Sequence, residues 1–262
     1  MVLAIDVGNS NIVIGVYEDG SLLFSSRMKT DIQKTEAEYA IMLHSLLKLN
    51  RFDPENMVGA AISSVVPSLN QIIADAVLML KKVTVVCVGP GVKTGLNIRI
   101  DDPASTGSDL VCTGVGALDR FPLPCIVIDL GTATKITVVD KNGAFIGGSI
   151  LPGVMISLAS LSSAAAQLPT IGLSGNIKVI GSNTVDCMLS GSVLGTASMI
   201  DGMIERYRQQ LGEIGSIVAC GGLVDAIIPH CNTPITIHKH LLLDGLYSIY
   251  RRNAPNPPSA SL

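Results

Sequence analysis

The chain has 262 residues, of which 48% are hydrophobic and 15% are charged, with a formal net charge of -3. This composition excludes an intrinsically disordered chain, which would have few apolar residues and many charges. The acidic balance, with 3% aromatic residues and no Trp, also argues against a nucleic-acid-binding surface, which needs basic side chains and stacking rings.

The first part of the chain predicts strands alternating with helices, as in an α/β domain. Thr35 and Glu38 have the spacing of a capping box, so a helix is expected to begin there and to run to about Leu49. Pro67 is a favoured first helical residue and opens a second helix that reaches Lys82. Strands are predicted at Leu3–Asp6, Ile12–Tyr17, Leu22–Met28, Val58–Ser63 and Val83–Val88.

The second part of the chain repeats this alternation. Strands are predicted at Ile126–Asp129, Ile136–Val139, Phe145–Ile150 and Ser216–Cys220, and helices at Asp109–Leu118, Val154–Ser163, Thr184–Leu211 and Leu242–Asn253. The helix at Thr184–Leu211 has more apolar residues than one face can hide, so it is either a subunit contact or a fully buried core helix. The tail 254–262 is rich in Pro and Ser and is expected to be mobile.

An internal repeat relates the two parts. Residues 6–23 and 129–146 align without a gap at an offset of 123, which is 129 minus 6. Asp6 then corresponds to Asp129 and Gly8 to Gly131. Each copy has a strand, an Asp-x-Gly turn, a second strand, an Asp-Gly or Asn-Gly turn and a third strand. The repeat predicts two domains of similar build, 1–114 and 115–253.

The repeated turn has residue types that suit phosphate chemistry. Glycine lets a phosphate approach the backbone, Asn, Ser and Thr offer donors, and Asp can hold Mg²⁺. One copy alone is better explained as a simple turn into a hairpin, but two copies resemble the paired phosphate loops of the actin-like ATPases and sugar kinases. That resemblance implies an α/β fold of two duplicated ribonuclease-H-like domains, with a nucleotide cleft between them and Gly221-Gly222 near the adenosine.

The N-terminus has no basic segment before its short apolar run, no stretch has the ~18 apolar residues of a membrane span, and no two of the six cysteines form a Cys-x-x-Cys pair. We therefore expect a cytoplasmic protein with reduced thiols and with neither a membrane nor a nucleic-acid partner.

Further motifs resemble those of the type III pantothenate kinases, over nearly the whole chain. In chain order they are Asp6–Asn11, with Ser10 in place of the usual Thr; Arg27, Thr30, Thr35 and Glu38; Gly107-Ser108-Asp109; Asp129–Thr134; Gly147-Gly148 to Pro152-Gly153; Asn183-Thr184 to Gly191; Gly221-Gly222; and Asp244-Gly245-Leu246 with Tyr250 and Asn253. Each motif alone is only modestly specific, so the resemblance depends on their common order.

The resemblance implies transfer of the γ-phosphate of ATP to the primary hydroxyl of pantothenate, which gives 4'-phosphopantothenate in the first step of coenzyme A biosynthesis. It also implies a homodimer and a need for Mg²⁺ and a monovalent cation, K⁺ or NH₄⁺. The expected partners are therefore pantothenate, ATP and a second copy of the chain.

The resemblance also implies roles for individual residues. Asp109 would be the general base, Asp129 would hold the monovalent cation, and Asp6 would hold Mg²⁺. The expected ATP-binding residues are Asp6, Val7, Gly8, Asn9, Ser10, Asn11, Ile12, Val13 and Thr132. The expected pantothenate-binding residues are Gly107, Ser108, Asp109, Leu110 and Thr184.

Three positions depart from the family's pattern near the expected acceptor pocket. Leu110 stands where the family has Arg, Ile100 where it has Tyr, and Lys135 where it has Thr. Arg is a natural partner for the pantothenate carboxylate, and its loss would lower affinity by about 10- to 150-fold. Lys135 is a candidate for the compensating charge. Two alternatives stay open: a kinase for another small hydroxyl compound, and a non-catalytic nucleotide-binding or accessory transcription regulator, which would bind ATP without turnover.

Overall fold

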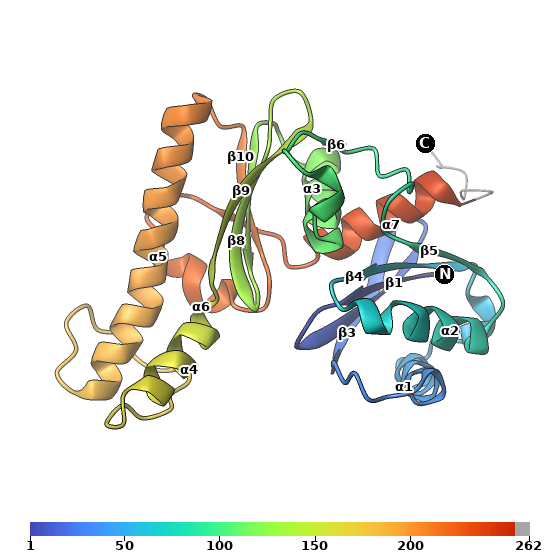
Figure 1. Cartoon of the computed structure of the whole chain (residues 1–262), viewed down its shortest axis with the longest axis horizontal. Helices are drawn as coiled ribbons and strands as arrows, with labels where there is room; N and C mark the ends of the chain where they lie inside the picture. The colour runs from blue at the N-terminus through green and yellow to red at the C-terminus, as the bar shows by residue number, and fades with distance from the viewer. Residues whose placement is uncertain (255–262) are drawn as a thin grey trace. The chain divides into compact units, whose positions relative to one another are not determined.

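The structure, a computed structural model, describes residues 1–254, so the tail predicted to be mobile lies outside the described residues except for Ala254 (Figure 1). The chain forms two compact units. The first unit contains 1–96, 101–119 and the C-terminal segment from Leu241, and the second contains 97–100 and 120–240. The units are therefore not the two successive segments 1–114 and 115–253, because the last helix returns to the first unit.

The first unit contains a five-stranded sheet of order β3-β2-β1-β4-β5. Strands β1, β2 and β3 are antiparallel neighbours, whereas β4 and β5 run parallel to β1. The strands are β1 (Val2–Val7), β2 (Asn11–Glu18), β3 (Ser21–Lys29), β4 (Gly59–Ser64) and β5 (Thr84–Cys87), and the helices are α1 (Glu36–Leu49), α2 (Asn70–Leu80), α3 (Ser108–Arg120) and α7 (Leu241–Asn253).

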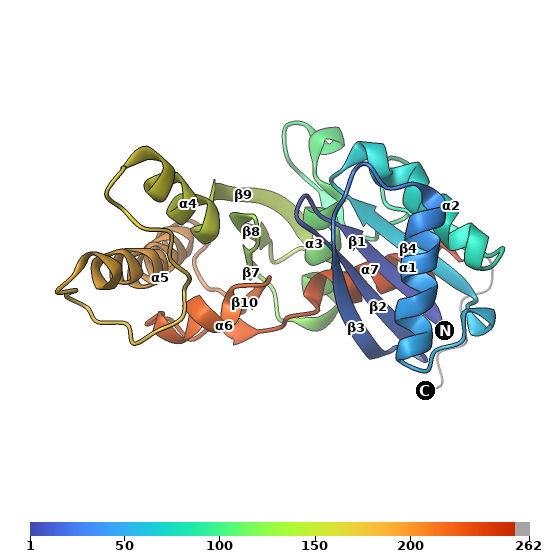
Figure 2. The ribbon, with the colours of Figure 1, turned by 90° about the horizontal axis from the view of Figure 1, so that it is seen from below.

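Helices α1 and α2 lie side by side over one face of this sheet (Figure 2). Alternate residues of β1, namely Leu3, Ile5 and Val7, are fully buried and pack in one apolar cluster with residues of both helices. This alternation is the period of two that a strand imposes on its side chains. The core of the first unit therefore forms from one face of β1 and the two helices that cover it.

Helix α7 packs against the opposite face, where the sheet has a row of small residues. Gly15, Ala4 and Ala61 are neighbours across three strands, and Gly59 lies two residues before Ala61. A Cβ atom added at Gly59 would overlap the ring of Tyr250, so glycine is required for the helix to approach this closely. The buried hydroxyl of Tyr17 also donates to Asp244 Oδ1 at 2.6 Å.

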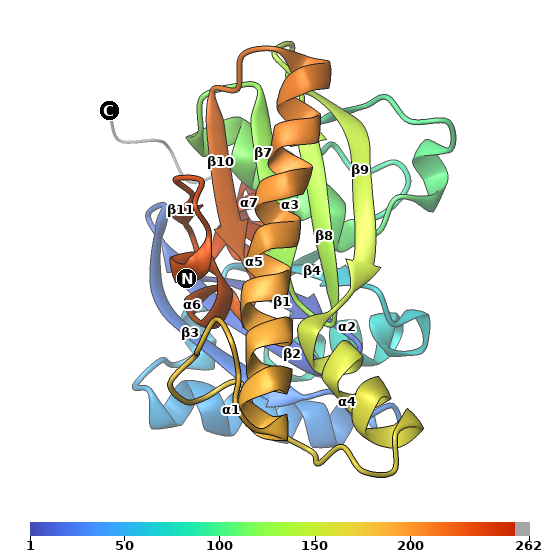
Figure 3. The same cartoon turned by 90° about the vertical axis from the view of Figure 1, so that its left-hand side faces the viewer.

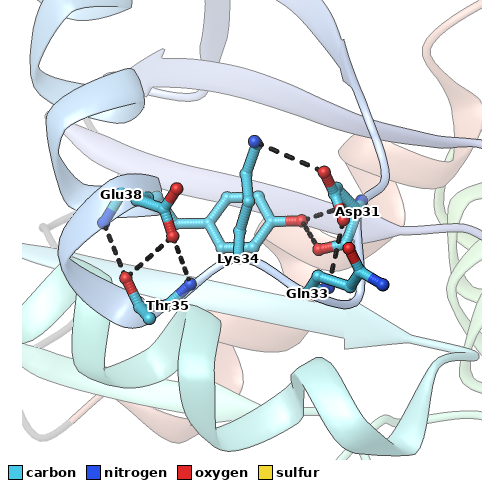
Figure 4. Close-up of polar contacts among 6 residues, drawn as sticks. Asp31, Gln33, Lys34, Thr35 and Glu38 are labelled. Carbon is cyan, nitrogen blue, oxygen red and sulfur yellow. Dashed lines mark hydrogen bonds and ion pairs between the residues drawn. The ribbon is translucent and has the colours of Figure 1, made fainter.

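Helix α1 begins with the predicted capping box (Figure 4). The backbone N–H of Glu38 donates to Thr35 Oγ1 at 3.4 Å, and the backbone N–H of Thr35 donates to Glu38 Oε2 at 2.9 Å. These bonds satisfy donors that the first helical turn leaves without partners. The backbone N–H of Thr35 is the main cause that lowers the pKa of Glu38. Part of the family's Thr-x-x-Glu motif therefore has a structural explanation.

The second unit contains a six-stranded sheet of order β11-β10-β7-β8-β9-β6. Its strands are β6 (Asn97–Ile98), β7 (Cys125–Leu130), β8 (Ala133–Val139), β9 (Ala144–Pro152), β10 (Ser216–Cys220) and β11 (Thr236–Ile237), and its helices are α4 (Val154–Ala164), α5 (Thr184–Leu211) and α6 (Val224–Ile227). Without the edge strand β6, the strand order and directions repeat those of the first unit, which confirms the predicted duplication.

Helix α5 runs along one face of the second sheet (Figure 3). Its buried residues Val193, Ala197, Ile200 and Ile204 pack in one cluster with β7. Because 33% of its most apolar 18-residue window is buried, α5 is not the fully buried core helix that was one alternative. By length and composition alone, α5 meets the criterion for a membrane span, which the sequence analysis found nowhere; core helices of other proteins also meet it.

Candidate active site

Asp6 lies at the end of β1, beside Ser63 in the parallel β1–β4 register. The hydroxyl of Ser63, which is fully buried, donates to Asp6 Oδ1 at 2.9 Å. This hydroxyl orients the carboxylate, whose oxygens are the kind of ligand that Mg²⁺ prefers. Ser63 was not predicted as a site residue, because a Ser at the end of a buried strand carries no distinctive sequence signal.

Asp109 lies in the first turn of α3. The backbone N–H of Leu110 donates to Asp109 Oδ1 at 2.8 Å and so orients the carboxylate. A Cβ atom at Gly107 would lie 2.5 Å from the same oxygen, so glycine leaves the room that Asp109 occupies. Ser108 Oγ donates to the backbone oxygen of Ser64 at 2.9 Å, which ties the start of α3 to the end of β4.

The Ser63 hydroxyl that donates to Asp6 also lies 3.1 Å from the hydroxyl of Ser108, the residue before Asp109. Cys112, a buried thiol, follows on α3. Burial raises the pKa of Cys112 well above its ordinary value, and the charges of Asp6 and Asp109 raise it further, against a hydrogen bond with Ser63. The thiol is therefore protonated and unreactive at neutral pH. The first unit thus brings together two carboxylates that the sequence analysis placed in different motifs.

The Asp-x-Gly turn of the first unit, which begins at Asp6, is held in place by hydrogen bonds from Thr30, the residue after β3. The backbone N–H of Gly8 donates to the backbone oxygen of Asn11 at 3.0 Å, which closes the turn. Thr30 Oγ1 donates to the oxygen of Gly8 at 2.6 Å, and the Thr30 N–H donates to the oxygen of Ser10 at 3.1 Å. Among the predicted ATP-binding residues, Val7 and Ile12 are buried core residues, whereas Asn9, Ser10 and Asn11 are exposed. The polar surface of this segment is therefore its turn.

The Asp-x-Gly turn of the second unit, which begins at Asp129, belongs to the β7–β8 hairpin. Here the backbone N–H of Gly131 donates to the oxygen of Ala133 at 3.2 Å, so the turn is one residue shorter than the first. The predicted phosphate contact, Thr132, is exposed at its tip. A Cβ atom at Gly153 would overlap the backbone oxygen of Thr132, so glycine lets the end of β9 lie directly against the turn.

Lys135 is the residue opposite Asp129 in this hairpin. Its Nζ lies 2.7 Å from Asp129 Oδ2, and each side chain is only 15% exposed. By sequence, Lys135 is a candidate partner for the acidic substrate, but within the second unit its ammonium pairs with Asp129. In the gap-free sequence alignment, Lys135 corresponds to Ile12 of the first hairpin. Because the second turn is one residue shorter, Lys135 is paired with Asp129 in the β7–β8 register.

Thr184 is the first residue of α5, and Asn183 before it caps the helix by accepting from the Asp186 N–H at 2.9 Å. Thr184 lines a cavity of about 570 Å³ in the second unit. The other lining residues are mainly apolar side chains of β9, α4 and α5, including Leu151, Val154, Leu161, Met188 and Met199. Of the predicted pantothenate-binding residues, 107–110 belong to the first unit and Thr184 belongs to the second.

Residues 1–254 contain no group of three or more His, Cys, Asp or Glu side chains that would hold a metal ion by themselves. Mg²⁺ that arrives on a nucleotide does not need such a group, because it is commonly held by one or two carboxylates and the substrate's phosphates. Asp6, which a hydroxyl orients, is such a carboxylate.

The duplicated sheets and their Asp-Gly turns define the class of protein. Residues 1–254 have the actin-like ATPase and sugar-kinase fold. The structure is similar to a putative Baf family transcriptional activator from Campylobacter jejuni, with a TM-score of 0.59, 16% identity and coverage of 96% of this chain and 98% of that one. It is also similar to the ADPNP-bound activator of 2-hydroxyisocaproyl-CoA dehydratase from Clostridium difficile, with a TM-score of 0.56, 14% identity and coverage of 95% and 93%. At these identities the similarity concerns the fold alone.

Sequence similarity identifies the family within this class. The family profile for type III pantothenate kinase matches residues 2–206. Type III pantothenate kinases from Halalkalibacterium halodurans and Geotalea daltonii are 39% and 37% identical over 253 residues, which cover 97% of this chain and 100% and 99% of theirs. The chain belongs to the type III pantothenate kinase family. Its activity is the ATP-dependent phosphorylation of pantothenate in coenzyme A biosynthesis.

Proposed function

We propose that Asp109 is the general base that accepts the proton of the pantothenate hydroxyl as the oxygen attacks the γ-phosphorus of ATP. The observation that carries this role is the placement of its carboxylate, which the Leu110 N–H orients. It follows Ser108, whose hydroxyl lies 3.1 Å from the Ser63 hydroxyl that donates to Asp6. Removing the proton raises the nucleophilicity of the hydroxyl oxygen, and a positioned base typically contributes ~10²–10⁴-fold to the rate.

The two Asp-Gly turns are proposed to bind the phosphates of ATP. In the first unit, the backbone and polar side chains of Gly8 to Asn11 offer hydrogen-bond donors, and Asp6 would hold Mg²⁺. In the second unit, the exposed hydroxyl of Thr132 offers a further donor. When bound, Mg²⁺ supplies positive charge to phosphate oxygens, and phosphoryl transfer depends mainly on such positioning and neutralisation.

The monovalent cation expected at Asp129 does not fit this chain. The Lys135 ammonium lies 2.7 Å from Asp129 Oδ2 and supplies the positive charge that a K⁺ or NH₄⁺ would bring to this carboxylate. A second cation at the same carboxylate would be repelled by the ammonium. No step of the reaction is therefore assigned to a free monovalent cation.

Residues 107–110 of the first unit and Thr184 of the second are each proposed to bind pantothenate. Leu110 cannot form a bidentate pair with the pantothenate carboxylate, so we expect a high KM for pantothenate. The protein is further proposed to be a cytoplasmic homodimer, as its family resemblance implies; the apolar side chains around the α4–α5 cavity support a subunit contact.

The test is turnover of purified protein with ATP and Mg²⁺, with and without pantothenate, with the product identified by mass as phosphopantothenate. Asp109→Asn is expected to lower kcat by ~10²–10⁴-fold with an unchanged melting temperature, because it removes the base and keeps the shape of the side chain. Asp119→Asn, a carboxylate at the other end of α3 that pairs with Arg252, is the matched control. ATP binding without pantothenate-dependent turnover in the unmodified protein would overturn the assignment.

A further inference from the structure

The Lys135–Asp129 pair is fixed by the register of the β7–β8 hairpin. Directly opposed residues of an antiparallel pair lie on the same face of the sheet, within reach of one another. The ammonium is thus held on the carboxylate by the backbone register as well as by its charge. Both side chains are 15% exposed, so solvent screens their attraction less than it would at the surface.

The first hairpin pairs its carboxylate with a different type of residue. Its longer turn puts Val13 opposite Asp6. The lysine is therefore not part of the duplicated Asp-Gly turn, and it belongs to the second hairpin alone. Its position requires an explanation in the chemistry of that hairpin.

A carboxylate beside a phosphate-binding turn is unfavourable unless a cation accompanies it. The carboxylate of Asp129 lies against Gly131, since a Cβ atom there would be 3.4 Å from Oδ1, and Thr132 follows at the tip of the turn. A phosphate that reached this turn would meet the negative charge of Asp129, and like charges repel more strongly when partly buried. A compact positive charge on Asp129 removes that repulsion, and the Lys135 ammonium is such a point charge.

We propose that the Lys135 ammonium takes the place of a free monovalent cation at Asp129, so that nucleotide binding by this protein does not depend on K⁺ or NH₄⁺. This inference rests on the proposed binding of ATP phosphates at the second turn. It does not rest on the identity of the acceptor, so it is tested by nucleotide binding as well as by turnover.

The experiment compares the unmodified protein with Lys135→Thr, Lys135→Arg and Lys141→Thr. Lys141 is an exposed lysine in the turn that follows β8, so it controls for the loss of one positive charge near the far end of the same strand. The affinity for the non-hydrolysable analogue AMP-PNP with Mg²⁺ is measured by calorimetry in N-methyl-D-glucamine chloride, KCl and NH₄Cl at equal ionic strength. Turnover with pantothenate is measured in the same three salts.

The affinity for AMP-PNP is expected to be the same in all three salts for the unmodified protein, for Lys141→Thr and for Lys135→Arg. Lys135→Thr is expected to lose about 10- to 150-fold in affinity without K⁺ or NH₄⁺, as for loss of a charged hydrogen-bonding partner, and to recover when either ion is added. Recovery by an ion that the unmodified protein ignores is a result that a merely structural role of Lys135 would not give.

Three outcomes would overturn the inference: K⁺-dependent binding by the unmodified protein, K⁺-independent binding by Lys135→Thr, or no nucleotide binding by any variant. Nucleotide binding with the expected salt pattern but without turnover would uphold the inference and reject only the proposed catalytic function. The two proposals can therefore fail separately.

Discussion

In the β1–β2 hairpin the residue opposite Asp6 is Val13, whereas in the β7–β8 hairpin the residue opposite Asp129 is Lys135. The two hairpins share an Asp-x-Gly turn and a strand order, but a turn shorter by one residue changes which side chain faces the carboxylate. The comparison teaches that two copies of a duplicated motif can share a strand order and a turn while different side chains face their carboxylates. Asp6 accepts a hydrogen bond from the Ser63 hydroxyl, and Asp129 forms an ion pair with Lys135.

The largest expected effect comes from removing the carboxylate charge in the first hairpin. Asp6→Asn is expected to lower kcat/KM by ~10²–10³-fold and to raise the Mg²⁺ concentration needed for half-maximal turnover, because a preorganised electrostatic group is lost. The measurement is turnover against Mg²⁺ concentration. Asp129→Asn is the comparison, and its Mg²⁺ requirement is expected to stay that of the unmodified protein. Equal shifts in both variants would break the distinction between the hairpins.

Smaller effects, on the free energy of unfolding, are expected at the residues that hold each Asp-x-Gly turn in place. Thr30 and Gly153 are equivalent at the offset of 123, but Thr30 braces its turn by hydrogen bonds and Gly153 does so by close packing. Gly153→Ala is expected to lower the free energy of unfolding by about 1–3 kcal/mol through overpacking. Thr30→Ala is expected to lower it by about 1 kcal/mol.

Urea denaturation measures both changes. Gly202→Ala is the control, since the space around Gly202 on α5 is open and alanine favours a helix, so this variant is expected to be as stable as the unmodified protein or more so. A Gly153→Ala variant that is also no less stable would show that the second turn yields without cost.

The smallest effect concerns the helices that follow the two hairpins. Helix α1 begins with the Thr35 and Glu38 capping box, whereas α4 begins at Gly153 without a side-chain cap. Thr35→Ala is expected to lower the free energy of unfolding by about 1 kcal/mol near neutral pH. Folding lowers the pKa of Glu38, so its contribution is present above the ordinary value of 4.5 and is lost as the pH falls through the folded value.

The difference in stability between Thr35→Ala and the unmodified protein is therefore expected to shrink as the pH falls below about 4.5. Urea denaturation across this range measures it, and Thr35→Ser, which keeps the cap, is the control. A difference that stays constant with pH would show that the glutamate half of the capping box contributes nothing.

Much of the fold could be predicted because its elements have strong local signals. The capping box at Thr35, the strand predicted at Leu3–Asp6 and the repeated Asp-x-Gly turns lie where the sequence predicts them. The two-residue strands β6 and β11 could not be predicted, since so short a segment has no periodicity.

What remained hidden depends on contacts distant in sequence. The return of α7 to the first unit depends on the fit of Tyr250 over Gly59, which are 191 residues apart by subtraction of their numbers. The pairing of Lys135 with Asp129 depends on the length of one turn, which sequence alignment to the first hairpin did not reveal. The hydroxyl of Ser63 reaches Asp6 only because β4 lies beside β1.

The small-residue face under α7 has a consequence for how the protein is made. A ribosome completes β1 to β5 early, but α7 is synthesised only after the entire second unit. Until then, Tyr17 and the row of small residues from Ala4 to Ala61 lack their covering helix. The second unit is nearly continuous in sequence, since it contains only 97–100 besides 120–240. It can therefore fold before the first unit is complete. A circular permutant that begins with α7 is therefore expected to reverse the order in which the two units become resistant to protease during synthesis.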